Sequence, residues 1–132
     1  MKSILEDIKN LEFKQVYLFY GEEGYLKKQY RDKLAGALNP DKDTMNMSHF
    51  EGKGLDVKEI ISLGETMPFF ADRRIILLEN TGFFKGQCPE LADYMNNLPD
   101  YLCMIFVEEE VDKRSRMYKA VKQQGRIVEF AI

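Results

Sequence analysis

Residues 16–28 of this 132-residue chain, VYLFYGEEGYLKK, carry its clearest indication of fold class. Its first five residues are all apolar or aromatic, a pattern that predicts a strand buried on both faces of a sheet. After Gly21, apolar side chains recur at every fourth position, at Leu26, Tyr30 and Leu34, which predicts a helix. A buried strand that runs through a glycine turn into a helix is typical of a parallel α/β sheet.

Strand and helix patterns continue to alternate along the rest of the chain. Four more strands are predicted, the first of them a weaker edge strand, at 45–50, 75–78, 102–107 and 126–130. Helices are predicted at 3–11, 56–67, 89–95 and 112–125. Their N-terminal caps are predicted at Ser3 (a capping box with Glu6), at Asp56 (with Glu59) and at Asp112. The sequence therefore predicts an α/β fold: one domain, residues 1–132, with a five-stranded, mainly parallel sheet flanked by helices.

The overall charge argues against a nucleic-acid-binding module. The net charge is −3 and the pI is near 5.3, so no global positive field would attract DNA or an anionic membrane. Local basic patches remain, because Lys113, Arg114 and Arg116 cluster near the start of the last predicted helix, and Arg73-Arg74 precede the third strand. A solvated basic turn and a contact with an acidic partner or a DNA backbone are both open for the 113–116 cluster.

The cysteines and the N-terminus predict a cytoplasmic setting. Cys88 and Cys103 lie 15 residues apart without the partners that a disulfide framework or a zinc site would need, and Cys103 falls inside a predicted buried strand. The N-terminal residues MKSILEDIKN lack an apolar run long enough for a signal peptide or a membrane span. We therefore expect a reduced, cytosolic protein with no membrane contact.

Residues 21–28 stand where a nucleotide-binding P-loop would open a helix. A working P-loop reads G-x-x-x-x-G-K-[ST]: backbone amides and the lysine bind phosphate, and the hydroxyl holds magnesium. Gly21 and Lys27 are present at the right spacing. Leu26 replaces the second glycine, however, and Lys28 replaces the hydroxyl residue. The segment is either a degenerate P-loop or an ordinary strand–turn–helix junction, and in both cases we expect no nucleotide cofactor.

Acidic residues follow the strands at the edge where such a ligand would bind. The glutamates at 22–23 would repel a polyphosphate. The third strand ends in Glu79, with apolar Leu78 where a Walker B aspartate would order magnesium, so no metal site is expected. The fourth strand ends in three glutamates, 108–110, which we interpret as a solvated strand end. With one histidine, His49, expected to be structural, and no nucleophile motif, no catalytic residue is predicted.

Residues 65–74, ETMPFFADRR, form the most unusual segment of the chain. Neighbouring side chains diverge by about 100° on a helix and about 180° on a strand, so Phe69 and Phe70 cannot both face inward on a regular element. One alternative is that the loop folds back and both rings plug the end of the core. The other is that Met67, Phe69 and Phe70 form an apolar wedge for a pocket on a partner protein, since aromatic anchors carry most interface energy. The pattern alone leaves both open.

Three segments together resemble the N-terminal domain of the delta subunit of bacterial DNA polymerase III, a clamp-loader family. They are YLFYGEEGYLKKQYRDKL at 17–34, ETMPFFADRRIILLEN at 65–80 and IFVEEEVDKRSRMYKAVKQQGRIVEF at 105–130. The resemblance covers essentially the whole chain. It implies an AAA+-like, P-loop-type fold that neither binds nor hydrolyses ATP and works within the polymerase III holoenzyme rather than as an enzyme by itself.

The resemblance also implies a partner. A hydrophobic pair before the third strand in this family enters a pocket of the ring-shaped sliding clamp, here Phe69 and Phe70, with Met67 in support. The family often has Leu-Phe at the pair, whereas the first position here is Phe. Full-length relatives continue into lid and collar domains, so we expect an excised domain that contacts other loader subunits, and DNA through the assembled complex, only in the full-length protein. The rival functions are a P-loop NTPase, a small nucleotide kinase or a DNA-binding module.

Overall fold

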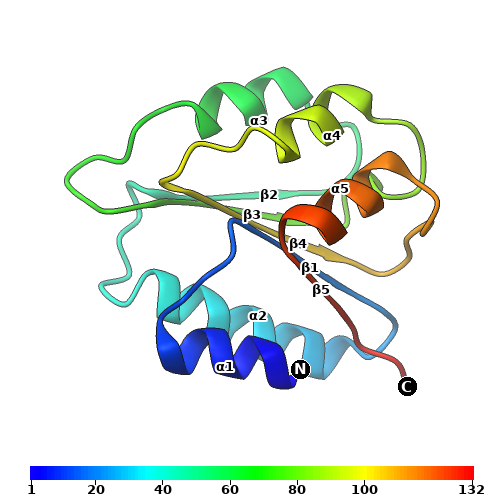
Figure 1. The fold of residues 1–132 in the computed structure, drawn as a ribbon, viewed down its shortest axis with the longest axis horizontal. Coiled ribbons are helices and arrows are strands. Elements are labelled where there is room, and N and C mark those ends of the chain that lie inside the picture. Colours follow the sequence, from blue (N-terminus) through cyan, green and yellow to red (C-terminus); the bar gives the residue numbers. More distant parts are fainter.

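Five parallel strands form one sheet in the computed structural model, which describes residues 1–132 (Figure 1). The strands lie in the order β2-β3-β4-β1-β5. Their bounds are β1 Val16–Tyr20, β2 Met47–Glu51, β3 Arg74–Glu79, β4 Leu102–Glu108 and β5 Arg126–Glu129. All four neighbouring pairs are parallel. The predicted α/β class, the number of strands and the edge position of β2 are confirmed, and the sheet is entirely parallel.

Helices cover both faces of the sheet. α1 and α2 lie on one face and α3, α4 and α5 on the other (Figure 1). Their bounds are α1 Lys2–Asn10, α2 Gly24–Leu38, α3 Val57–Gly64, α4 Pro89–Met95 and α5 Arg116–Gln124. Strand β1 shows why its sequence is continuously apolar: Tyr17 and Phe19 pack in the core under α1 and α2, while Val16, Leu18 and Tyr20 pack in the opposite core. All five residues of β1 are buried.

Two helix starts differ from the sequence prediction. α1 begins at Lys2 and has no side-chain cap, so the capping box predicted at Ser3 and Glu6 does not form. α5 begins at Arg116, and the Ser115 hydroxyl caps it by accepting the Tyr118 N–H at 3.1 Å. Asp112, the predicted cap, instead accepts the Arg114 N–H at 2.9 Å in the preceding turn. Serine and aspartate are comparable caps, so the cap preference alone does not decide between them.

Helix α3 begins as its sequence predicts and ends earlier. Asp56 is its N-cap and accepts the Lys58 N–H at 3.0 Å. The helix stops at Gly64, so Met67 is not helical, contrary to the prediction. A Cβ on Gly64 would lie 2.5 Å from the Tyr94 hydroxyl, which shows that α3 and α4 pack too closely here for a larger residue. The stop leaves residues 65–73 free to form a separate loop.

A buried polar network fixes helix α1 on the sheet. The Asp7 carboxylate accepts hydrogen bonds from the Tyr17 hydroxyl at 2.9 Å and from Arg126 Nε and Nη2 at 2.8 and 2.9 Å. Asp7 is buried, and its partners lie on β1 and β5. Bidentate pairing of this kind compensates for the cost of burying a carboxylate. The network therefore sets the position of α1, including its C-terminal cap residue Leu11.

The parallel topology divides the connecting loops between two edges of the sheet. Loops that follow strands, such as the Gly21 turn, lie at the carboxyl edge, and loops that precede strands, such as residues 65–73, lie at the amino edge. The two segments that the sequence singles out therefore lie at opposite edges. None of the helices combines the length and the apolar character that crossing a bilayer would require.

Candidate functional site

At the carboxyl edge, Gly21 makes the turn between β1 and α2. Its φ of 126° lies in the region that favours glycine, and a Cβ there would lie 2.2 Å from the Phe130 carbonyl oxygen. The Phe130 carbonyl in turn accepts the Glu23 N–H at 3.0 Å. The first glycine of the P-loop-like pattern is thus required by the close packing of this turn against the end of β5.

The P-loop-like lysine and the start of α2 are occupied by internal contacts. Lys27 Nζ donates hydrogen bonds to the carbonyl oxygens of Gly21 at 2.7 Å and Glu108 at 3.0 Å. The Glu23 carboxylate accepts the Leu26 N–H at 2.6 Å in the first turn of α2. Burial lowers the pKa of Lys27, although the nearby carboxylates act in the opposite direction. The two groups with which a P-loop binds phosphate, the lysine and the helix N-terminus, are both engaged, and Lys28 is exposed.

Glu79, at the Walker B-like position, forms an internal ion pair. Arg31 of α2 donates to Glu79 Oε1, and His49 Nε2 lies 3.1 Å from Glu79 Oε2. Burial lowers the pKa of Arg31, but its hydrogen bonds to Glu79 and Asp32 outweigh that effect, and the pKa is raised. Candidate ligand atoms of His49, Glu51 and Glu79 lie within 4.8 Å of one another. A cation bound there would compete with the Arg31 guanidinium for Glu79.

The prediction that residues 108–110 form a solvated strand end is wrong for Glu108. Its side chain is buried and accepts hydrogen bonds from the Thr81 hydroxyl at 2.8 Å, the Thr81 N–H at 3.2 Å and the Gly82 N–H at 3.1 Å. Burial raises the pKa of the Glu108 carboxyl, and the bonds from Thr81 and Gly82 offset part of the rise. The donors lie in the loop after β3, far from Glu108 in the sequence. The periodicity of a single strand does not predict such a contact. Glu109 and Glu110 are exposed, as expected.

The open space left at the carboxyl edge is strongly acidic. A hollow of about 450 Å³ there includes four carboxylates, those of Glu22, Glu109, Glu110 and Glu129. Like charges in one hollow raise the cost of binding an anion. The space beside the Gly21 turn therefore disfavours a polyphosphate.

At the amino edge, the three residues of the proposed wedge lie at the surface. Met67 is 74% exposed, Phe69 53% and Phe70 93%, so neither ring plugs the core. The two rings meet edge to face with centroids 4.5 Å apart. Phe70 adopts a φ of 54°, in the left-handed region that costs a bulky side chain about 1–2 kcal/mol. We call Met67, Phe69 and Phe70 the wedge.

Two buried polar side chains hold the backbone of the wedge. Asn46, only 3% exposed, accepts the Phe69 N–H at 2.6 Å and donates to the Phe69 carbonyl at 2.8 Å. Arg74, only 5% exposed, donates to the carbonyls of Thr66 at 2.7 Å and Met67 at 3.2 Å. Sequence reasoning missed both anchors. The one available signal is an arginine immediately before the apolar run of β3, where an unpaired charge would be costly to bury.

The basic residues near α5 are largely paired within the domain. Arg114 Nε lies 3.2 Å from Asp112 Oδ1, and Arg116 Nη2 lies 2.7 Å from Asp93 Oδ1. All these side chains lie at the surface, where such pairs contribute about 0–1 kcal/mol each. The cluster is therefore closer to the solvated basic turn than to a concentrated positive patch.

Comparison with known proteins gives a consistent picture. The profile of the family described as "DNA polymerase III, delta subunit" matches residues 17–131. The DNA polymerase III subunit delta of Bacillus subtilis (strain 168) is 24% identical over 139 aligned residues, which cover 96% of this chain and 40% of that protein. This chain therefore spans well under half the length of that relative.

Two solved structures share the fold. The Bacillus subtilis DNA clamp loader delta protein superposes with a TM-score of 0.85 at 22% identity, covering 98% of this chain and 42% of that one. A DNA polymerase III gamma subunit-related protein from Thermotoga maritima superposes with a TM-score of 0.69 at 11% identity, covering 98% of this chain and 46% of that one. Together with the profile match over most of its length, these findings place the chain in the DNA polymerase III delta subunit family.

Proposed function

We propose that this domain is a non-catalytic part of a clamp loader and binds the ring-shaped sliding clamp through the wedge. The observation that carries the proposal is the exposure of three large apolar side chains on one loop that buried groups hold in place. Exposed apolar side chains grouped in this way mark interaction sites. The delta-subunit family supplies the class of partner.

The anchoring of the loop supports a binding role. Four hydrogen bonds join the side chains of Asn46 and Arg74 to the backbone of this loop, so its main chain is ordered before a partner arrives. Preorganisation reduces the entropy that binding would otherwise lose. The left-handed φ of Phe70 directs a fully exposed ring outward at a conformational cost, which is typical of functional positions.

The carboxyl edge supports the absence of nucleotide chemistry in this proposal. Lys27 is bonded to two carbonyls, Glu79 to Arg31, and the adjacent hollow is lined by carboxylates. The domain would then act through binding alone. Tighter binding of the wedge to an open clamp than to a closed one would shift the clamp towards the open ring, because a ligand moves an equilibrium only by its differential affinity. Other loader subunits would supply the ATP-driven steps and the contact with DNA.

Isothermal titration calorimetry of this chain with a bacterial sliding clamp tests the proposal. Phe69→Ala combined with Phe70→Ala should weaken binding by about 30- to 1,000-fold, since anchor residues contribute on the order of 2–4 kcal/mol. Tyr25→Ala is the matched control, because Tyr25 is an aromatic that is 71% exposed on α2 at the opposite edge of the sheet. The control should bind as the parent chain does.

Two results would contradict the proposal. One is clamp binding by the folded double variant at the parent affinity, with folding verified by circular dichroism. The other is saturable binding of ATP and magnesium to the parent chain, which would favour the rival NTPase or kinase function. A Lys27→Ala variant would then show whether the P-loop-like lysine carries that binding.

A further inference from the structure

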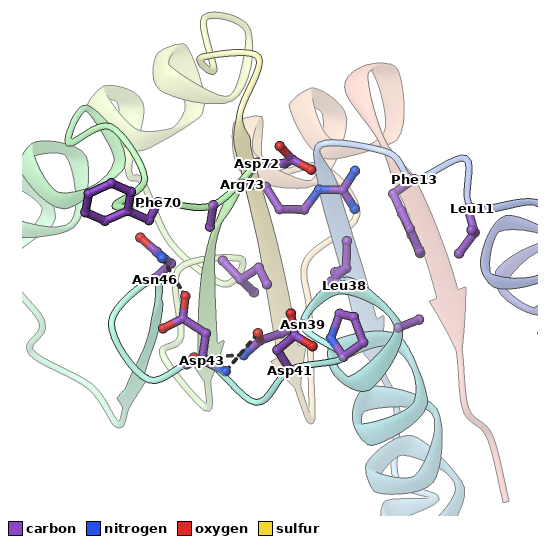
Figure 2. Close-up of a pocket in the computed structure, with 14 residues that line it drawn as sticks. Leu11, Phe13, Leu38, Asn39, Asp41, Asp43, Asn46, Phe70, Asp72 and Arg73 are labelled. Atoms are coloured by element: carbon purple, nitrogen blue, oxygen red, sulfur yellow. Dashed lines mark hydrogen bonds between the residues drawn. The ribbon is translucent and has the colours of Figure 1, made fainter.

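A groove of about 510 Å³ lies beside the wedge at the amino edge (Figure 2). Its apolar part is formed by Leu11 and Phe13 after α1, Leu38 at the end of α2, and Phe70 and Ile75 on either side of the start of β3. Figure 2 shows Phe70 on one side of the groove and Phe13 with Leu11 on the other. Phe70 therefore belongs to both the wedge and the lining of the groove, and its ring extends to the side away from Phe13 and Leu11.

The polar part of the groove is mainly acidic. Asp41, Asp43 and Asp72 line it, against a single cation, Arg73. The Arg73 guanidinium lies over the Phe13 ring, 5.0 Å from its centroid, and forms no ion pair with a carboxylate. Asp41 and Asp72 are exposed and take part in no hydrogen bond or salt bridge. Two negative charges at the groove thus lack a partner within the domain.

Two helices add negative potential at the same place. The C-cap residues of α1 and α2, Leu11 and Asn39, both line the groove. A helix C-terminus carries a partial negative charge. Hydrogen bonds from the Asn46 side chain and the Met45 N–H lower the pKa of Asp43, so its carboxylate stays charged at neutral pH. The groove is therefore complementary to a positively charged group on an apolar stem.

A continuous chain of hydrogen bonds joins the groove to the wedge. The Asn39 side chain donates to the Asp43 carbonyl at 2.8 Å, and the Asn46 side chain bonds both the Asp43 carboxylate and the Phe69 backbone. Phe70, the most exposed residue of the wedge, also lies at the border of the groove. A partner that encloses the Phe70 ring would therefore lie next to the groove.

We propose that this groove receives a lysine- or arginine-bearing loop of the same sliding clamp that the wedge binds. The aliphatic stem of the basic side chain packs against the apolar part, and its charged head meets Asp41 and Asp72. This inference rests on the proposed function and adds a second, electrostatic point of contact. Charge complementarity at such a site contributes to partner selection and to the rate of association.

The test is a titration of this chain with the sliding clamp at low and at high salt. Asp41→Asn combined with Asp72→Asn should weaken binding roughly five- to tenfold at low salt, and the loss should shrink as salt screens the contact. Glu22→Gln combined with Glu59→Gln removes the same charge from exposed carboxylates elsewhere and should bind as the parent chain does. Asp41 and Asp72 are exposed and form no hydrogen bond or salt bridge within the domain, so the variant should keep its fold.

The outcomes separate this inference from the proposed function. If the Phe69 and Phe70 substitutions abolish binding but the aspartate variant binds like the parent chain at both salt concentrations, the groove proposal is overturned and the wedge proposal stands. If the aspartate variant loses the same affinity for the clamp at low and at high salt, the proposal that the groove receives a basic side chain is overturned. No clamp binding by the parent chain would overturn both proposals.

Discussion

Replacing Asn46 with alanine should loosen the wedge while leaving the sheet intact. The Asn46 side chain is 3% exposed and makes two hydrogen bonds to the Phe69 backbone, at 2.6 and 2.8 Å. Each such bond contributes about 1 kcal/mol net, so local opening of the loop should become easier by about 2 kcal/mol. That difference corresponds to an increase of about 30-fold in the opening equilibrium.

Amide hydrogen exchange measured by NMR reports this opening residue by residue. The Phe69 amide should exchange about 30-fold faster in Asn46→Ala, because its acceptor is removed. The Ile75 amide is an internal control: it donates to the backbone carbonyl of residue 46 at 2.9 Å, a bond that the substitution keeps. Met45→Ala is the matched variant, since Met45 is an exposed neighbour of Asn46.

Unchanged protection of the Phe69 amide would refute the assignment of Asn46 as an anchor. Equal acceleration at Phe69 and Ile75 would also refute it, because the substitution would then have destabilised the whole domain rather than the loop. If the assignment holds, Asn46→Ala should also weaken clamp binding. The effect should be smaller than that of replacing both Phe69 and Phe70, because Asn46→Ala keeps the wedge side chains.

Three further predictions follow from single residues. Phe70→Gly should be more stable to thermal unfolding than Phe70→Ala by about 1 kcal/mol, since both lack the ring and only glycine adopts a φ of 54° without strain; equal melting temperatures would contradict this. The Glu108 carboxyl has a pKa in the folded state that lies above its value in the unfolded state. Its contribution to folding stability is therefore fully present below about pH 4.3 and is lost as the pH rises through the folded-state pKa. Chemical unfolding should therefore show that Glu108→Gln gains stability relative to the parent chain from pH 4 to 7. A difference in unfolding free energy that stays constant over this pH range would contradict the prediction. Burial raises the pKa of Cys103 to about 12, so mass spectrometry after alkylation at neutral pH should find Cys103 unmodified until the chain is unfolded.

The sheet could be predicted from the sequence because its strands carry a strong local signal. Residues 75–78 are continuously apolar, and the structure buries every residue of β3 between two helix layers. The P-loop-like spacing of Gly21 and Lys27 was also visible, and the two do meet in the structure. Their contact is structural, however, because Lys27 bonds carbonyl oxygens that only the folded sheet brings together.

The anchors of the candidate site could not be predicted, because their partners are distant in sequence. Asn46 bonds the backbone of Phe69, 23 residues away, and Glu108 bonds Thr81, 27 residues away. Side-chain periodicity indicates which face of a strand or helix a residue occupies. It does not indicate which backbone groups of a distant loop will lie against that face. The sequence leaves the exposure of Phe69 and Phe70 open for the same reason, because the distant Asn46 holds the loop that carries them.

We propose that the amino edge of the sheet binds the partner, whereas the carboxyl edge binds no nucleotide. Amide hydrogen exchange of this chain, measured with and without a saturating sliding clamp, locates the contact surface. We expect slower exchange in residues 65–73 and in the groove loop 39–46, and no change around Gly21, Glu79 and Glu108. Protection confined to the carboxyl edge, or none at residues 65–73 under conditions where the clamp is bound, would contradict the account.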